Sequence, residues 1–237
     1  MRVHRALAQA GVASRRGAEM LIEEERVYVN GKRAVIGQIV MPTDRIEVDG
    51  RLVTAEPIQT YMLNKPIGMV STASDPEGRP TVVDALPKDV RLYPVGRLDI
   101  DTTGILLITN DGDLAHRLMH PSSKVTKTYE AMVRGQVSAA SVRQLRDGIE
   151  LDDGMTQPAK VEIMDRKAVG ATWVRIEITE GRNRQVRRMC DAIDHPVIKL
   201  MRTRYGGLNL GKLQRGEYRA LASSEINRLE KLAGVTR

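Results

Sequence analysis

The segment from Gly96 to Gly104 contains the residue best suited to chemistry, Asp99. Asp99 stands between two apolar residues, Leu98 and Ile100, and this placement favours a carboxylate that is partly buried. Because an unpaired charge is costly to bury, we expect a cationic partner for it. A carboxylate held in this way could act as a nucleophile or as a base in a closed site.

A calcium loop is one alternative for the same segment. Asp99, Asp101, Thr103 and Gly104 occupy loop positions one, three, five and six, but Asn110 occupies position twelve, where a bidentate acid is needed. A calcium site is therefore not expected. A magnesium pair of Asp99 and Asp101 is also disfavoured, because we expect these neighbours on an extended segment to point to opposite sides.

A second cluster of chemical groups lies between Gly181 and Met189. If Asn183 caps a helix here, three arginines spaced i, i+3 and i+4 share one helical face: Arg184, Arg187 and Arg188. Like charges packed in this way destabilise a helix, so the pattern indicates an anionic partner. That partner is a phosphate group, Asp99, or both.

Nucleotide and metal sites find little support in the sequence. Gly206–Lys212 has the spacing of a phosphate-binding loop, but Leu213 replaces the Ser or Thr that would bind magnesium. The preceding Met201–Tyr205 is expected to be too basic for a buried strand. The four histidines stand at unrelated spacings and are expected to be structural, and Cys190 is expected to lie in the core.

The basic residues are concentrated in one part of the chain. From Arg182 to Arg219 there are ten basic residues against three acidic ones, a surplus equal to the net charge of the whole chain, +7. A basic block in an otherwise neutral chain indicates a surface that faces a polyanion. Aromatic residues make up 3% and Phe is absent, which disfavours a stacking platform for single strands and favours folded RNA.

The overall composition is typical of a globular protein of the cytoplasm. A length of 237 residues suits one sizeable domain and a small one, and 41% of the residues are hydrophobic. The apolar runs are too short to span a membrane, and no segment has the pattern of a signal peptide. A single cysteine excludes an internal disulfide.

Residues 1–53 are predicted to form a small α+β module that positions part of the basic surface. Val3, Leu7 and Ala10 fall on one face of a helix, Gly11 stops that helix, and Ser14 can cap a second helix that runs to residue 24. Two β-hairpins follow, with Asn-Gly and Asp-Gly at their turns. Basic side chains gather before the first acid of the module and are expected to bind phosphate: Arg2, Arg5, Arg15 and Arg16.

Residues 54–60 are predicted to be a linker, and residues 61–237 a larger domain. Its strand patterns cover residues 105–109, 128–133, 159–164, 172–179 and 197–201. Its helical patterns cover residues 113–119, 139–146, 184–193 and 224–232. Because strands outnumber helices and alternate in polarity, we predict an α+β domain with a mixed, mainly antiparallel sheet.

Four motifs stand in the order found in a known enzyme family: Asn64–Gly68, Gly96–Gly112, Lys127–Tyr129 and Glu180–Met189. Together they closely resemble the pseudouridine synthases of the ribosomal small subunit pseudouridine synthase A-like family. Residues 1–53 resemble the RNA-binding module of ribosomal small-subunit protein four, which precedes the catalytic domain in these enzymes. Asp75–Pro80 and Tyr93–Val95 are nearest to members that act on large-subunit ribosomal RNA.

The resemblance implies an activity, the isomerisation of a uridine in structured ribosomal RNA to pseudouridine by base flipping. The implied substrate is 23S large-subunit RNA, with small-subunit RNA as the second choice, either free or in a ribosome assembly intermediate. No cofactor, nucleotide or metal is expected, because the reaction involves no net oxidation or group transfer.

The same resemblance assigns roles to residues. Asp99 would be the catalytic aspartate, which attacks the sugar, attacks the base or only removes a proton. Tyr129 would pack against the flipped base, and Arg187 would pair with Asp99. Arg97 would occupy the space that the base vacates or hold the backbone. Two further arginines are expected to contact RNA, Arg184 and Arg188.

Two other classes of protein remain as alternatives. A non-catalytic RNA-binding protein would explain the first module and the basic block, but not Asp99 together with matching tyrosine and arginine motifs. A metal-dependent nuclease would need a carboxylate cluster that the sequence does not offer.

Overall fold

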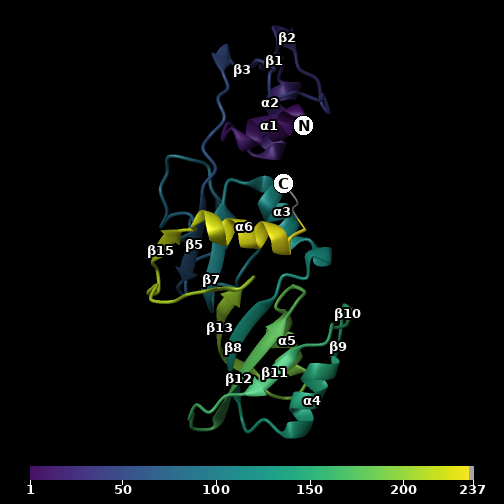
Figure 1. Cartoon of the computed structure of the whole chain (residues 1–237), viewed down its shortest axis with the longest axis vertical. Helices are drawn as coiled ribbons and strands as arrows, with labels where there is room; N and C mark the ends of the chain where they lie inside the picture. The colour runs from purple at the N-terminus through teal and green to yellow at the C-terminus, as the bar shows by residue number, and fades with distance from the viewer. Residues whose placement is uncertain (235–237) are drawn as a thin grey trace. The chain divides into compact units, whose positions relative to one another are not determined.

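The computed structural model describes residues 1–234 and divides them into two units. The first unit holds Met1–Gln59 and two short segments of later chain, Lys88–Leu92 and Asn110–Gly112. The remaining described residues form the second, larger unit. Figure 1 shows the helices and strands of each unit.

Two helices of the first unit follow the predicted pattern, α1 (Val3–Gln9) and α2 (Arg15–Glu23). Gly11 ends the first helical segment in a left-handed conformation, with φ of +73°. The hydroxyl of Ser14 caps α2 by accepting a hydrogen bond from the Gly17 N–H at 2.9 Å. The predicted helices, stop signal and cap are confirmed.

The sheet of the first unit is antiparallel, in the order β2-β1-β3-β4. Its strands are β1 (Val27–Val29), β2 (Lys32–Arg33), β3 (Ile46–Val48) and β4 (Arg51–Leu52). Both predicted turns are confirmed, because Asn30, Gly31, Asp49 and Gly50 all have φ between +50° and +77°. A type I′ hairpin turn requires positive φ at both central residues.

A nine-stranded sheet forms the centre of the larger unit, with the main order β11-β12-β8-β13-β7-β5-β15. The strands are β5 (Thr60–Lys65), β6 (Tyr93–Val95), β7 (Thr102–Thr109), β8 (Lys127–Arg134), β11 (Lys160–Ile163), β12 (Ala171–Ile178), β13 (Val197–Tyr205), β14 (Leu208–Asn209) and β15 (Tyr218–Ala220). Every described pair is antiparallel except β13 with β7. The predicted mainly antiparallel sheet is confirmed.

Helices and one small hairpin complete this unit. The helices are α3 (Gly112–Met119), η1 (Pro121–Ser123), α4 (Ala139–Asp147), α5 (Gln185–Asp191) and α6 (Ser223–Leu232). The hairpin pairs β9 (Glu150–Leu151) with β10 (Gly154–Met155). None of the helices within residues 1–234 combines the length and the apolar character needed to cross a bilayer.

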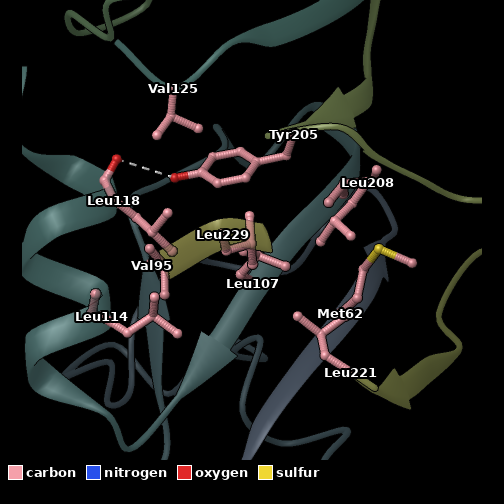
Figure 2. Close-up of a cluster of buried hydrophobic side chains, with 12 residues drawn as sticks. Met62, Val95, Leu107, Leu114, Leu118, Val125, Tyr205, Leu208, Leu221 and Leu229 are labelled. Atoms are coloured by element: carbon pink, nitrogen blue, oxygen red, sulfur yellow. Dashed lines mark hydrogen bonds between the residues drawn. The ribbon is translucent and has the colours of Figure 1, made fainter. Parts of the chain in front are cut away.

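One hydrophobic core joins α3 and α6 to the sheet, as Figure 2 shows. Leu118 of α3 and Leu229 of α6 meet Met62 of β5 and Leu107 of β7 there, and all four are at most 1% exposed. Tyr205 ends β13 inside this cluster, where its hydroxyl donates to the carbonyl of Leu118 at 3.4 Å. This core holds the ends of β7 and β13 in place.

The parallel pairing of β7 with β13 requires a glycine. Gly104 has φ of +104°, and a Cβ at this position would overlap the backbone of Arg202 on the neighbouring strand. Without a side chain, the two backbones approach closely at the start of β7. The turn that carries Asp99 leads directly into this strand.

Two local predictions are wrong. Met201–Tyr205 is not too basic for a buried strand: it completes β13, and Arg202 is only 3% exposed because its Nε donates to the carbonyl of Ile105 at 2.7 Å. The arginine helix starts one residue later than expected. Arg184 precedes it as the N-cap residue with φ of +46°, so Asn183 is not the cap. The prediction that Cys190 lies in the core is confirmed.

Candidate active site

Asp99 lies in the turn between β6 and β7, and a buried lysine holds the backbone of this turn by hydrogen bonds. The Nζ of Lys65 donates to the carbonyl of Asp99 at 2.9 Å and to that of Thr102 at 3.0 Å. It also lies 3.1 Å from the carbonyl oxygen of Pro66 and 3.4 Å from that of Ile100. Lys65 is fully buried, and this burial lowers its pKa to about 8, although the charges of Asp101 and Asp99 act in the opposite direction.

A serine fixes the chain on the other side of the aspartate. The hydroxyl of Ser71 donates to the carbonyl of Leu98 at 2.7 Å and accepts from the N–H of Leu98 at 3.1 Å. The turn itself closes through a hydrogen bond from the Thr102 N–H to the carbonyl of Asp99 at 3.0 Å. With Lys65 on one side and Ser71 on the other, the backbone of Asp99 is restrained in both directions along the chain.

Two arginines face the carboxylate of Asp99, whose side chain is 25% exposed. Nη1 of Arg184 donates to Oδ2 of Asp99 at 3.3 Å. Nε of Arg187 lies 3.6 Å from the same oxygen, and the Arg187 side chain is only 8% exposed. The site therefore holds one carboxylate between an exposed guanidinium and a buried one.

Arg187 makes its shorter contact with the other acid of the turn. Its Nη2 lies 2.9 Å from Oδ2 of Asp101 and 3.3 Å from Oγ1 of Thr102. We expected Asp99 and Asp101 to point to opposite sides, and this expectation is wrong. Residues two apart in an extended segment share a side, and here the chain turns, so that both carboxylates reach the same guanidinium.

Tyr129 shares a cavity with the aspartate. Residue 129 is on β8, is 9% exposed, and lines this cavity together with Asp99, Arg97, Arg184 and Leu200. Arg97 is exposed at the cavity, while Arg187 is not among its lining residues. The structure thus brings an acid, a tyrosine ring and three cations, Arg97, Arg182 and Arg184, to one cavity.

Arg188 does not line this cavity and binds a different acid, so the three arginines do not share one anionic partner. Its Nη2 donates to Oδ2 of Asp153 at 2.9 Å, and its Nε donates to the carbonyl of Asn183 at 2.9 Å. Arg182 donates to Oδ1 of the same carboxylate at 3.1 Å. These hydrogen bonds, first from Arg188 and then from Arg182, lower the pKa of Asp153 to about 2. The arginine segment is therefore fastened to the β9–β10 hairpin.

The four predicted RNA-binding arginines of the first module lie on its helical layer. Arg2 is the N-cap residue of α1, and Arg15 and Arg16 open α2. These three side chains are exposed, whereas Arg5 is half-buried. No acidic residue lies in the first turn of either helix, so the basic side chains face the positive end of a helix dipole.

Sequence reasoning gave no role to three residues of the site, Lys65, Ser71 and Arg202, and considered Asp101 only as a metal ligand. A lysine inside an apolar strand was a usable signal for the first, because such a residue has to be buried with partners. The others carry no local signal, since their partners are brought together only by the fold.

The chain is similar to known proteins over most of its length. The family model described as RNA pseudouridylate synthase matches residues 59–192, and the S4 domain model matches residues 1–46. The chain is 47% identical to a ribosomal large subunit pseudouridine synthase B of Bacillus subtilis over 236 residues, which cover 98% of this chain and 96% of that protein. It is also 47% identical to an uncharacterized RNA pseudouridine synthase of Mycobacterium bovis, over 99% of this chain and 95% of that protein.

A solved structure is similar over nearly the whole chain. The crystal structure of a pseudouridylate synthase matches with a TM-score of 0.70 and 33% identity, and the match covers 97% of this chain and 99% of that one. The similarity therefore extends over both units of the chain.

Proposed function

The chain belongs to the RNA pseudouridylate synthase family, and on that premise we propose that it converts a uridine of 23S ribosomal RNA to pseudouridine with Asp99 as the essential residue. Small-subunit RNA is the second candidate substrate. The similar proteins named for the large subunit support the first choice.

One observation carries the proposal: Asp99 lines a cavity together with Tyr129, and its carboxylate lies 3.3 Å from Arg184 and 3.6 Å from Arg187. The reaction breaks the bond from ribose C1′ to N1 of uracil and forms a bond from C1′ to C5. The base must leave its stack to rotate, which costs a few kcal/mol. A single carboxylate held by fixed guanidinium groups suits this chemistry.

The other residues of the cavity receive roles under the same proposal. Tyr129 packs against the flipped base, and Arg187 pairs with Asp99 and orients its carboxylate. Arg97 is exposed at the opening and occupies the space that the base vacates or holds the RNA backbone. Arg184 is placed to contact both Asp99 and the RNA, while Arg188 is committed to Asp153 and contributes less to RNA binding.

Residues 1–53 act as the RNA-binding module in this proposal, residues 54–60 as a linker and residues 61–237 as the catalytic domain. The match of residues 1–46 to the S4 domain supports the first assignment. The substrate is ribosomal RNA, free or in an assembly intermediate, and the site of action is the cytoplasm.

Tritium release provides the test. Ribosomal RNA labelled with tritium at C5 of uridine should lose label with the wild-type protein and lose none with Asp99→Asn. Because Asp99 is an acid in a basic site, the variant should bind RNA within a few-fold of wild type. Pseudouridine mapping of the treated 23S and 16S RNA then identifies the substrate. Substantial release by Asp99→Asn would contradict the assignment, and modification confined to 16S RNA would contradict the choice of subunit.

A further inference from the structure

Arg202 is a buried cation without an acidic partner. It is 3% exposed, and among residues 1–234 no carboxylate lies within ion-pair distance of its guanidinium. Its Nε donates to the carbonyl of Ile105 at 2.7 Å, and its Nη2 is buried without any hydrogen-bond partner. Because a buried unpaired charge is costly, an arginine in this position calls for a function.

The remaining nitrogen of Arg202 reaches Tyr129. Nη1 donates to the hydroxyl oxygen of Tyr129 at 3.4 Å, and the guanidinium carbon lies 6.0 Å from the centre of that ring. Both residues are paired neighbours on adjacent strands, β13 and β8, so their side chains lie on the same face of the sheet. Tyr129 lines the cavity beside Asp99, whereas Arg202 is not among the residues that line this cavity.

The direction of this hydrogen bond decides what the tyrosine can do. A guanidinium has five N–H donors and no acceptor, so the Tyr129 oxygen must be the acceptor. The phenolic proton is then left over, and no acceptor among the described residues takes it. Tyr129 therefore keeps one donor for the cavity, and the positive charge behind it strengthens that donor.

The reaction creates a matching acceptor. When the bond from C1′ to N1 breaks, its electron pair stays on uracil, and the negative charge spreads onto the two carbonyl oxygens. The ring then uses a pair at C5 to bond C1′, C5 loses its proton, and N1 takes one up, so that no oxidant or reductant is needed. A hydrogen-bond donor that is already positioned where negative charge develops in the transition state makes one of the largest contributions to catalysis.

We propose that Arg202 is a positioning residue that, through the hydroxyl of Tyr129, stabilises the negative charge on a carbonyl oxygen of the detached uracil. This role rests on the proposed function. The charge of Arg202 also acts on a lysine outside the lining of this cavity: burial and then Arg202 lower the pKa of Lys127 to about 8, against the opposite effect of Glu180. Besides Tyr129 and the carbonyl of Ile105, the guanidinium of Arg202 faces the ring of Tyr205, whose centre lies 5.1 Å from the guanidinium carbon.

The test compares Arg202→Met, Arg202→Lys and Tyr129→Phe, with Arg204→Met as the matched control. Arg204 is two residues further along β13 and is exposed. Single-turnover rates at saturating RNA are measured on transcripts that carry uridine or 5-fluorouridine at the target position, from loss of the target nucleoside. The uracil anion is more stable when C5 carries fluorine. Cleavage of the bond from C1′ to N1 therefore depends less on a hydrogen bond from the protein to the anion.

We expect Arg202→Met and Tyr129→Phe to lower the uridine rate by about 10²-fold, the lower end of the loss for one such donor. Their loss with 5-fluorouridine should be at least tenfold smaller. The double variant should be no slower than the slower single variant, because the two groups act as one unit. Arg204→Met should stay within a few-fold of wild type with both substrates.

Equal losses with both bases, or additive losses in the double variant, would overturn the proposal. A deuterium isotope effect at C5 that grows in Tyr129→Phe would also overturn it, because it would make the hydroxyl a base for the C5 proton. If Arg202→Met does not fold, Arg202→Lys and Tyr129→Phe decide the question by the same comparison. A wild-type protein that forms no pseudouridine would instead refute the proposed function, which separates the two failures.

Discussion

Replacing Arg187 should separate catalysis from RNA binding more sharply than any other change at the site. The guanidinium bridges two carboxylates, with Nε 3.6 Å from Asp99 and Nη2 2.9 Å from Asp101. Arg187→Ala would leave both acids of one turn without their shared cation. Arg187→Lys would keep a charge, but an ammonium is a point charge and cannot hold both carboxylates in the fixed geometry of a planar fork.

The magnitude follows from burial. Removing one partner of a fully buried ion pair costs about 3–5 kcal/mol. Here the side chains of Asp99 and Asp101 are 25% and 49% exposed. Water can therefore solvate the two carboxylates in the variant and offset part of this cost. We therefore expect Arg187→Ala to lower the free energy of unfolding by about 2 kcal/mol. The turnover rate should fall by about 10²–10³-fold, as for loss of one fixed electrostatic group.

Single-turnover kinetics at saturating RNA, with affinity measured separately by titration, provide the assay. Arg187→Ala and Arg187→Lys should both lower the rate with little change in affinity, because the side chain does not line the cavity. Asp99→Asn combined with Arg187→Ala should be little worse than Asp99→Asn alone. Arg188→Ala serves as comparison, since it removes a guanidinium from the same helix without touching Asp99. Near-normal rates for Arg187→Ala would refute the reasoning and make Arg184 the essential partner.

Three further predictions concern the surroundings of the site. Ser71→Ala removes both hydrogen bonds to Leu98 and should lower the free energy of unfolding, measured by denaturant titration, by about 1–3 kcal/mol. The single-turnover rate should also fall. An unchanged rate would show that these two hydrogen bonds do not orient Asp99. The pKa of Asp153 is lowered to about 2, so the stabilisation that it provides is present above the ordinary carboxyl pKa and is lost as the pH falls toward 2. Wild type should therefore exceed Asp153→Asn in stability at pH 5 and lose that advantage below about pH 4 in urea titrations, whereas a constant difference would contradict the shift. Deleting residues 1–53 should weaken RNA binding and reduce the log–log salt slope by about one for each phosphate that the protein no longer neutralises; an unchanged slope would show that the module does not bind RNA.

Much of the fold could be predicted because its signals are local. The Asn30-Gly31 turn, the cap at Ser14 and the alternating pattern of β8 and β12 each depend on residues within a few positions of one another. The predicted helices and strands of the larger unit accordingly lie within three residues of the observed ones, apart from β13, which runs four residues further. Six short elements were not predicted: β6, η1, β9, β10, β14 and β15. The exception at β13 is instructive, because Arg202 looks like a surface residue until its partners are known.

The candidate site could be predicted only in part. Asp99, Tyr129 and Arg187 stand out through their motifs, but the sequence does not show that Arg187 makes its shorter contact with Asp101. That contact depends on a turn whose backbone is fixed by Lys65, which is 34 residues away in sequence from Asp99. The left-handed conformation of Arg184 is equally invisible, since arginine has no local preference for it.

The close approach of β7 and β13 at Gly104 has a consequence for how the protein is made. The contact joins Gly104 to Arg202, so Asp99 acquires its final surroundings only when chain far toward the C-terminus has been synthesised. A sheet assembled from such distant segments has a high loop-closure cost and folds slowly compared with one built from neighbouring strands. A nascent chain that ends before Val197 lacks both β13, which joins β8 to β7 in the sheet, and the arginine that donates to Tyr129. Catalytic competence is thus acquired late in synthesis.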